Sequence, residues 1–274
     1  IPNFDYLKER KEHIKAYIIT HAHDDNMLAL PYIYHECPAP IVTTKFTGKM
    51  IEYAAKGLGI KDKYNFDFVD LNSSKVIAGY KFYFCQVTHS MPFTFGFSLK
   101  TDQGQIIYTS NYLLDWSLSD PNFKLDTNSL LKHSRDDILL VLSDSTNAHI
   151  QGHNSPNYRL TNKISKYFED QEGRIYISLY SQNYFNILEV IKLCIKNNKT
   201  IIFSKKTDEI QIMGLINEFN LIEGIKPKLE NVENIHRIKS ANTVVIIMNT
   251  GEKLFDEIIT ISSGTMDRKP ISFD

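Results

Sequence analysis

The sequence predicts a mixed α/β protein, and three observations support this prediction. Short apolar runs bounded by turn residues alternate with stretches of helical period. Hydrophobic residues make up 42% of the 274 positions and charged residues 23%, which provides enough apolar material for one large domain or two ordinary ones. The longest apolar runs, such as Ile138 to Leu142, are far shorter than a membrane-spanning helix. We therefore expect a folded α/β protein with no membrane span.

The first half of the chain predicts hairpin-rich β structure with two early helices. The candidate helices are Leu28–Glu36 and Phe46–Lys56, and the second is expected to end at Gly57 and Gly59, where a left-handed cap is easy. A turn at residues 102–104 joins two of the strands as a hairpin. The predicted strands are Ala16–Thr20, Ile41–Thr43, Phe82–Thr88, Phe95–Lys100, Ile106–Thr109 and Ile138–Ser143.

The second half of the chain changes to strict alternation of strand and helix. This alternation is typical of a parallel sheet. The stretch Gln151–Arg159 is rich in Asn, Gly, Ser and Pro and is the expected boundary, so we predict domains over residues 1–154 and 155–274. The expected elements of the second domain are Arg174–Leu179, Tyr184–Lys196, Thr200–Ser204, Asp208–Phe219 and Thr243–Met248.

Charge and cysteine usage limit the possible environments and partners. The formal net charge is −1, so no global field indicates nucleic acid or an acidic membrane, and any RNA site must be local. Cys37, Cys85 and Cys194 share no metal-binding spacing, and their odd number without a signal peptide favours the reducing cytoplasm. We expect them to be buried small side chains.

Residues 20–26 read Thr-His-Ala-His-Asp-Asp-Asn and carry the most informative chemistry. Two imidazoles one residue apart at the end of a strand can hold one Zn²⁺, and a following Asp-His pair normally holds a second ion. Here Asn26 stands where that pair would have its histidine. We expect His21 and His23 to face one ion, and Asp25 to face a neighbouring position ~3.5–4 Å away.

Three later segments lie at the ends of predicted strands, and we predict that they contribute to the same metal site: 87–90, 108–111 and 142–147. They bring in His89 as a third metal ligand and Asp144 as a supporting carboxylate. A lone strand-end histidine is more often a hydrogen-bonded or surface residue than a ligand, and Asp-Ser-Thr-Asn is also good turn chemistry. The remaining histidines fit no ligand spacing and are expected to be solvated: His13, His35, His133, His149, His153 and His236.

In this order the segments resemble the ribonuclease J family, in the β-CASP branch of the metallo-β-lactamase superfamily. The resemblance runs over essentially the whole chain. It implies an αββα metallo-β-lactamase sandwich, partly present in residues 1–154, and an inserted β-CASP α/β domain, partly present in residues 155–274. It also implies two metal ions, usually Zn²⁺, RNA as the substrate, the cytoplasm and an oligomer. The segments that carry it are 1–7, 18–26, 29–32, 88–90, 108–111 and 143–147.

The departures from the family pattern fall on catalytic positions. The last motif histidine is Asn26, the bridging aspartate is Asn111 and an expected glutamate is Asn157. An amide offers a neutral oxygen and cannot hold two cations together as a carboxylate does. The resemblance also places substrate-binding positions at Ser181 and Asn183.

What survives is the family's first metal site, His21, His23 and His89, with Asp25 as the remnant of the second. Three histidines and water form a sufficient zinc set, so we predict at most one zinc ion, bound weakly, and possible loss of all metal. Asp25 and Asp144 are the catalytic candidates. We also expect the chain to be a piece of a longer protein, because Ile1 is not a methionine.

Three functions fit these residues. The first is a degenerate ribonuclease J-like subunit of RNA processing or decay, weakly active or inactive, that forms homo- or hetero-oligomers with an active homologue. The second is an active zinc-dependent ribonuclease, exonucleolytic from the 5′ end or endonucleolytic, or another hydrolase of the same fold. The third is a binding module only, using a basic surface with aromatic rings at Lys45, Lys49, Lys56, Lys61, Lys63, Tyr64 and Phe66, although such a charge run is usually a solvated helix face.

Overall fold

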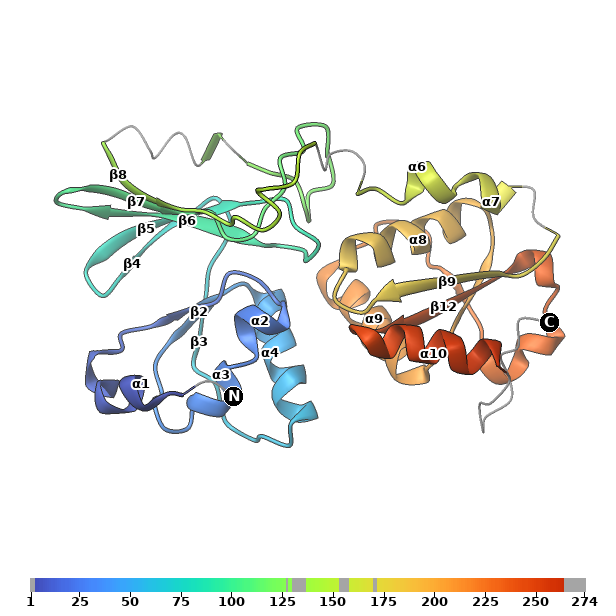
Figure 1. Cartoon of the computed structure of the whole chain (residues 1–274), viewed down its shortest axis with the longest axis horizontal. Coiled ribbons are helices and arrows are strands. Elements are labelled where there is room, and N and C mark those ends of the chain that lie inside the picture. The colour runs from blue at the N-terminus through green and yellow to red at the C-terminus, as the bar shows by residue number, and fades with distance from the viewer. Residues whose placement is uncertain (1–2, 127, 130–136, 153–157, 170–171, 264–274) are drawn as a thin grey trace. The chain divides into compact units, whose positions relative to one another are not determined.

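The structure is a computed structural model that describes residues 3–126, 128–129, 137–152, 158–169 and 172–263 (Figure 1). It is a mixed α/β structure, as predicted. The chain divides into two compact units, Ile1–Ser155 and Pro156–Asp274, drawn from blue to green and from yellow to red. Among the described residues, no helix has the length and apolar character needed to cross a membrane.

The first unit contains two sheets. The smaller is parallel, with strand order β1-β2-β3, and the larger has the order β4-β5-β6-β7-β8 and is antiparallel except for the parallel pair β7 and β8. The strands are β1 (Tyr17–Ile18), β2 (Ile41–Thr43), β3 (Phe66–Phe68), β4 (Ser74–Ile77), β5 (Tyr80–Gln86), β6 (Phe95–Thr101), β7 (Gly104–Tyr108) and β8 (Ile138–Leu142). The hairpin predicted at residues 102–104 is confirmed as the β6–β7 turn.

The core of the first unit lies between the two sheets. Val42 from β2, Phe84 from β5 and Phe95 from β6 are buried in one cluster, which Ile18 from β1 also contacts. Burying large apolar side chains from both sheets stabilises their face-to-face packing. The start of β6 is tied to the end of the smaller sheet by a hydrogen bond from Phe95 N to Thr20 O, 3.2 Å long. This packing fixes the segment that precedes His21.

The helices of the first unit are short except for α4. This helix begins where Thr44 accepts a hydrogen bond from Thr47 N, and Gly59 beyond its end has a φ of +74°. The predicted helix Leu28–Glu36 is only partly correct, because within it only the single turn α3 (Leu30–Ile33) is helical, and a separate short helix, α2 (Asp24–Met27), ends just before it. The helices are α1 (Asp5–Glu9), η1 (Lys11–His13), α2 (Asp24–Met27), α3 (Leu30–Ile33) and α4 (Lys45–Gly57).

The second unit is built on a parallel sheet, as the alternation of strand and helix predicted. Its strand order is β11-β10-β12-β9. The strands are β9 (Ile175–Tyr180), β10 (Thr200–Phe203), β11 (Lys228–Leu229) and β12 (Thr243–Asn249). The helices are α6 (Thr161–Ile164), α7 (Lys166–Glu169), α8 (Tyr184–Lys196), α9 (Lys206–Phe219), η2 (Val232–Arg237), η3 (Ser240–Asn242) and α10 (Glu252–Ser262).

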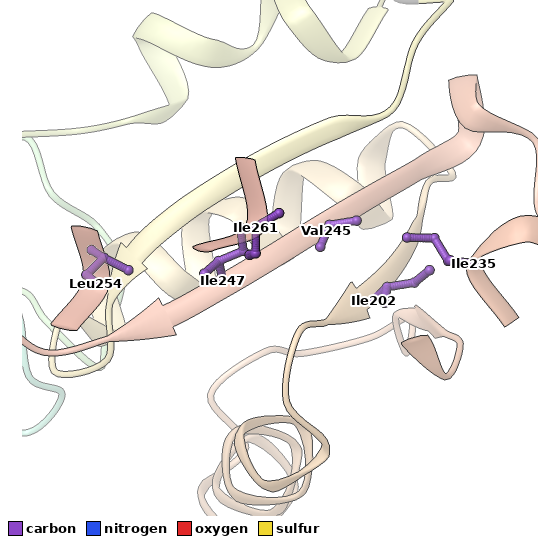
Figure 2. Close-up of a cluster of buried hydrophobic side chains, with 6 residues drawn as sticks. All are labelled: Ile202, Ile235, Val245, Ile247, Leu254 and Ile261. Carbon is purple, nitrogen blue, oxygen red and sulfur yellow. The ribbon is translucent and has the colours of Figure 1, made fainter. Parts of the chain in front are cut away.

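The second unit has its own core, which Figure 2 shows. Leu254 and Ile261 of α10 pack against Val245 and Ile247 of β12. Val244 and Ile246 point to the opposite face of the same strand and are equally buried. Because β12 is buried on both faces, its sequence is a continuous apolar run, and that run is what predicted the strand.

Candidate metal centre

Three histidines from two distant parts of the first unit meet at one point. His21 follows the end of β1, His23 precedes the first turn of α2, and His89 follows β5. Their candidate ligand atoms all lie within 4.8 Å of one another. The ring centroids are 4.6 to 5.0 Å apart. The structure therefore places together the three residues that the sequence predicted as one metal site.

Hydroxyl groups orient the rings of this cluster. Thr20 Oγ1 lies 3.1 Å and Ser110 Oγ 3.3 Å from His21 Nδ1, and the two hydroxyls are 2.9 Å apart. Ser90 Oγ lies 3.1 Å from Nε2 of His23. Hydrogen-bond partners on one ring nitrogen fix the orientation of the other, which is the usual arrangement behind a metal-binding histidine.

The remaining nitrogen of His21 marks the place for an ion. His21 is only 1% exposed, and its Nε2 is buried with no hydrogen-bond partner. A buried polar atom without a partner costs free energy unless something fills the position. His23 Nδ1 and His89 Nε2 lie 3.0 Å apart beside it. The donor set therefore fits one cation that prefers nitrogen ligands.

Burial favours the neutral form of His21 and His89. Desolvation lowers the pKa of His21 to about 3, and the neighbouring His23 contributes to this lowering. Desolvation, then His23 and His21, lower the pKa of His89 to about 3. At neutral pH the rings of His21 and His89 are therefore uncharged, and their lone pairs are available to a metal.

Two carboxylates act on the cluster from its rim. Asp144 and Asp25 both raise the pKa of His89, though less than burial lowers it. Asp144 has its own pKa lowered, first by hydrogen bonding to Thr146, whose N donates to its Oδ1 over 2.9 Å. The turn role considered for Asp144 is therefore confirmed. The negative charge of the same carboxylate also raises the pKa of His21 and of His89.

The position expected for a second metal ion lacks most of its ligands among the described residues. Asn26 Oδ1 is buried without a hydrogen-bond donor, and Asn111 directly follows Ser110. Both are amides where a paired site needs an imidazole and a bridging carboxylate. Asn157, the third departure, lies outside the described residues. Of the expected second-site groups that the structure describes, only Asp25 is a carboxylate.

Comparison with known proteins assigns a relationship to this geometry. Curated proteins named Ribonuclease J 2 from Staphylococcus epidermidis and Staphylococcus aureus are 26% identical to the chain over 249 residues. The chain is ribonuclease J-like. The aligned residues are 90% of this chain but only 44% of each relative, so the chain spans less than half of their length.

Two further comparisons concern the fold and the family. A crystal structure of a protein of unknown function from Enterococcus faecalis V583 matches with a TM-score of 0.58 at 13% identity. It covers 86% of this chain and 59% of that one, and it supports the fold alone. No protein-family profile matches the chain.

The predicted substrate positions of this ribonuclease J-like chain lie in the second unit, after β9. Ser181 N donates to Asn249 O over 3.0 Å. The side chain of Asn183 accepts from Asn186 N over 3.1 Å and caps α8. Asn183 therefore has a clear structural role, and a substrate role for either residue stays a prediction.

Other sequence predictions can be checked in the described residues. His13, His35, His149 and His236 are exposed, as expected, and His133 and His153 lie outside the described residues. The three cysteines are buried and unpaired. The predicted basic surface has mixed charge: a recess of about 460 Å³ is lined by lysines and acids alike, namely Glu52, Lys56, Lys61, Asp62 and Lys63, with Tyr64.

Sequence reasoning missed the hydroxyls that orient the rings. Thr20, Ser90 and Ser110 each lie inside a predicted site segment, and Thr20 and Ser90 directly adjoin His21 and His89, which is the signal that could have found them. Ser110 also has a φ of +57°, a conformation uncommon for a residue with a side chain. Its placement against His21 depends on the packing of two sheets whose strands are far apart in the sequence.

Proposed function

We propose that this ribonuclease J-like chain binds RNA and holds one divalent metal ion, with Zn²⁺ as the first candidate, on His21, His23 and His89. The observation that carries the proposal is the buried, unpartnered Nε2 of His21 beside the imidazoles of His23 and His89. Three imidazole nitrogen donors match the ligand preference of zinc. The ribonuclease name of the relatives supports RNA as the ligand class.

Catalysis by this site is proposed to be weak or absent. A bound ion would supply Lewis acidity and a water of lowered pKa at this position. The chain itself provides the neutral ring of His21, oriented by Thr20 and Ser110, and Asp25 and Asp144 as candidate proton acceptors near His89. Without ligands for a second ion, nothing in the described residues stabilises the leaving oxygen, so hydrolysis should be slower by orders of magnitude.

The role that follows is that of a partner subunit in RNA processing or decay. A chain that binds RNA but cleaves it poorly can position substrate for an active ribonuclease J homologue in a homo- or hetero-oligomer. We place this assembly in the cytoplasm, and the three unpaired, buried cysteines support a reducing compartment. The alternative is a mononuclear ribonuclease, favoured by the action of Asp25 and Asp144 on His89.

The two units are proposed to be parts of the two domains that the resemblance implies. Support for a metallo-β-lactamase-like part in residues 1–154 comes from two sheets packed on a shared core with the histidines after strand ends. Support for a β-CASP-like part in residues 155–274 comes from the parallel sheet with helices that follow its strands. An experimental structure of a longer relative tests this assignment, because each unit should superpose on one of its two domains.

The experiment that tests the function separates binding from cleavage. Single-stranded RNA labelled at its 5′ end is incubated with the zinc-loaded protein alone, with an active ribonuclease J, and with both together. We expect RNA binding, very slow cleavage by the protein alone, and a changed rate or product pattern in the mixture. Fast zinc-dependent cleavage by the protein alone, lost in His21→Ala, would favour the active enzyme. Absence of RNA binding and of any effect on the active enzyme would contradict the proposal.

A further inference from the structure

Trp116 is the one tryptophan of the chain, and it is 72% exposed. It lies on the loop that follows β7 and Ser110. Along this stretch the side chains alternate, because Leu114 is also exposed at 54% while Asp115 between them is only 3% exposed. The loop thus turns its polar anchor inward and its two large apolar side chains outward. An indole buries a large apolar area when a partner covers it, so Trp116 offers a strong contact at this point of the surface.

The loop is fixed to the segment that carries the candidate metal centre. Leu113 N donates to Thr88 O over 2.8 Å, directly before His89 in the sequence. On the far side of the loop, Phe93 N donates to Asn122 O over 2.8 Å. Both ends of the loop are therefore bonded to the short stretch between β5 and β6 that contains the third histidine.

The tip of the loop is held as well. Asp115 Oδ1 accepts a hydrogen bond from Ser117 N over 3.0 Å and another from Ser117 Oγ over 2.7 Å. A buried aspartate that bonds the backbone two residues ahead forms a tight local turn. Trp116 is the residue enclosed by this turn. The hydrogen bonds of this turn fix the backbone of Trp116, so its side chain is exposed on an ordered loop.

We infer that Trp116 stacks on a base of single-stranded RNA bound beside the histidine cluster. The inference rests on the proposed function and adds a residue that positions the RNA. An indole offers a wide apolar ring that any base can cover, and aromatic stacking is the common way in which proteins hold unpaired bases. A ring on a preorganised loop loses little freedom when the base arrives.

The charged residues of the loop that carries Trp116 indicate which part of the RNA the indole contacts. Asp115 and Asp120 use their carboxylates on Ser117 and on Asn122 N. The loop offers more acidic than basic groups, which disfavours a phosphate contact at this point. The contact made by Trp116 is therefore with a base face rather than with the backbone, and its contribution should be insensitive to salt.

A protein partner fits this feature less well than RNA does. A stable protein interface needs about 800 Å² on each partner. Here Leu114 and Trp116 are followed by the exposed polar residues Ser117 and Ser119. Two apolar side chains on one loop do not make such an area, whereas one ring suffices for one base.

The single tryptophan makes the test direct, because its fluorescence reports this ring alone. The 274-residue protein is titrated with a single-stranded oligouridylate and an oligoadenylate of about twelve nucleotides, and affinity is measured in parallel by anisotropy of a label on the RNA. We expect saturable quenching by both RNAs. Trp116→Ala should weaken binding by about 5- to 150-fold, Trp116→Tyr should retain most of the affinity, and Leu114→Ala should change it little.

Four results would overturn the inference, and they differ in what they say of the proposed function. RNA binding without quenching, and with equal affinity in Trp116→Ala, removes the role of Trp116 but leaves RNA binding intact. A loss in Trp116→Ala that shrinks steeply between about 50 and 200 mM salt indicates a phosphate-linked effect instead of stacking. No RNA binding at all removes both proposals, while a Trp116→Ala change in sedimentation instead assigns the ring to a protein contact.

Discussion

At the scale of single residues, the sequence prediction and the structure agree best at the three histidines, where Nε2 of the buried His21 has no hydrogen-bond partner. Histidines one residue apart indicated a metal site, and the structure brings the candidate ligand atoms of His21, His23 and His89 within 4.8 Å of one another. The sequence could not show that Ser110 orients His21, because that contact joins residues 89 positions apart. Nor could it show the depth of burial that lowers both histidine pKa values.

Removal of one orienting hydroxyl tests the arrangement of the rings. Ser110→Ala deletes the group that lies near both Thr20 Oγ1 and His21 Nδ1. We expect metal affinity to fall by about 10- to 100-fold while the fold is retained, because such supporting groups orient the ligand. The measurement is competition for zinc with a chelator of known affinity. Ser119→Ala, an exposed serine, is the matched control, and equal affinities in the two variants would contradict the role of Ser110.

The pH dependence of stability follows from the buried histidines. In the folded, metal-free protein the pKa of His21 and of His89 is about 3, below the ordinary value of 6.5. The unfolded chain therefore binds more protons between these values, and stability must decrease as the pH falls from about 6.5 towards 3. Urea unfolding of metal-free protein at neutral pH and at about pH 5 checks this. A free energy of unfolding that is unchanged or greater at the lower pH would show that the rings are more hydrated than their burial indicates.

At the scale of elements, the strand and helix patterns predicted most of the regular structure. β2 and α8 have the predicted bounds, whereas β3, β4 and β11 were not predicted. β3 and β11 are only two or three residues long, so they lack the length that a periodic pattern needs. Helix Leu28–Glu36 was wrong in extent, because a proline follows the first residue of α3 and the chain divides into short turns.

The glycine at position 96 is explained by the close approach of two neighbouring strands beside the site. A Cβ on Gly96 in β6 would lie 2.6 Å from Tyr108 O and 3.0 Å from Thr109 O, backbone atoms of the two residues that precede Ser110. We expect Gly96→Ala to destabilise the protein by about 1–3 kcal/mol and to weaken metal binding, because the backbone must move. Gly214→Ala in α9 meets nothing within 4 Å and should stabilise by about 0.5–1 kcal/mol. Urea unfolding of the two variants checks the pair, and a neutral Gly96→Ala would contradict the packing.

At the scale of the whole molecule, the chain carries two hydrophobic cores in two compact units. The change from hairpins to alternating strand and helix predicted two kinds of sheet, and the sheets have those forms. The sequence could not predict which strands are neighbours: β12 lies between β10 and β9, an order that depends on crossovers.

Separate cores predict separate consequences for mutation. Ile247 is buried in the core of the second unit with Leu254 and Ile261 (Figure 2). Ile247→Ala should destabilise the protein by about 2–5 kcal/mol and Ile247→Val by about 0.5–1.5 kcal/mol. The metal content per folded chain should remain that of the unaltered protein, because all three ligands belong to the first unit. Loss of metal from folded Ile247→Val protein would show that the site depends on the second unit.

The most direct test of the central claim is the metal content of the purified, zinc-loaded protein, measured by mass spectrometry under native conditions. His21→Ala/His23→Ala is the test variant, and His13→Ala/His149→Ala, which removes two exposed histidines, is its matched control. We expect one zinc per chain, lost in the test variant and kept in the control. Two ions per chain would mean that Asn26 and Asn111 are compensated by other groups, and no bound ion, or one that survives the test variant, would contradict the three-histidine site.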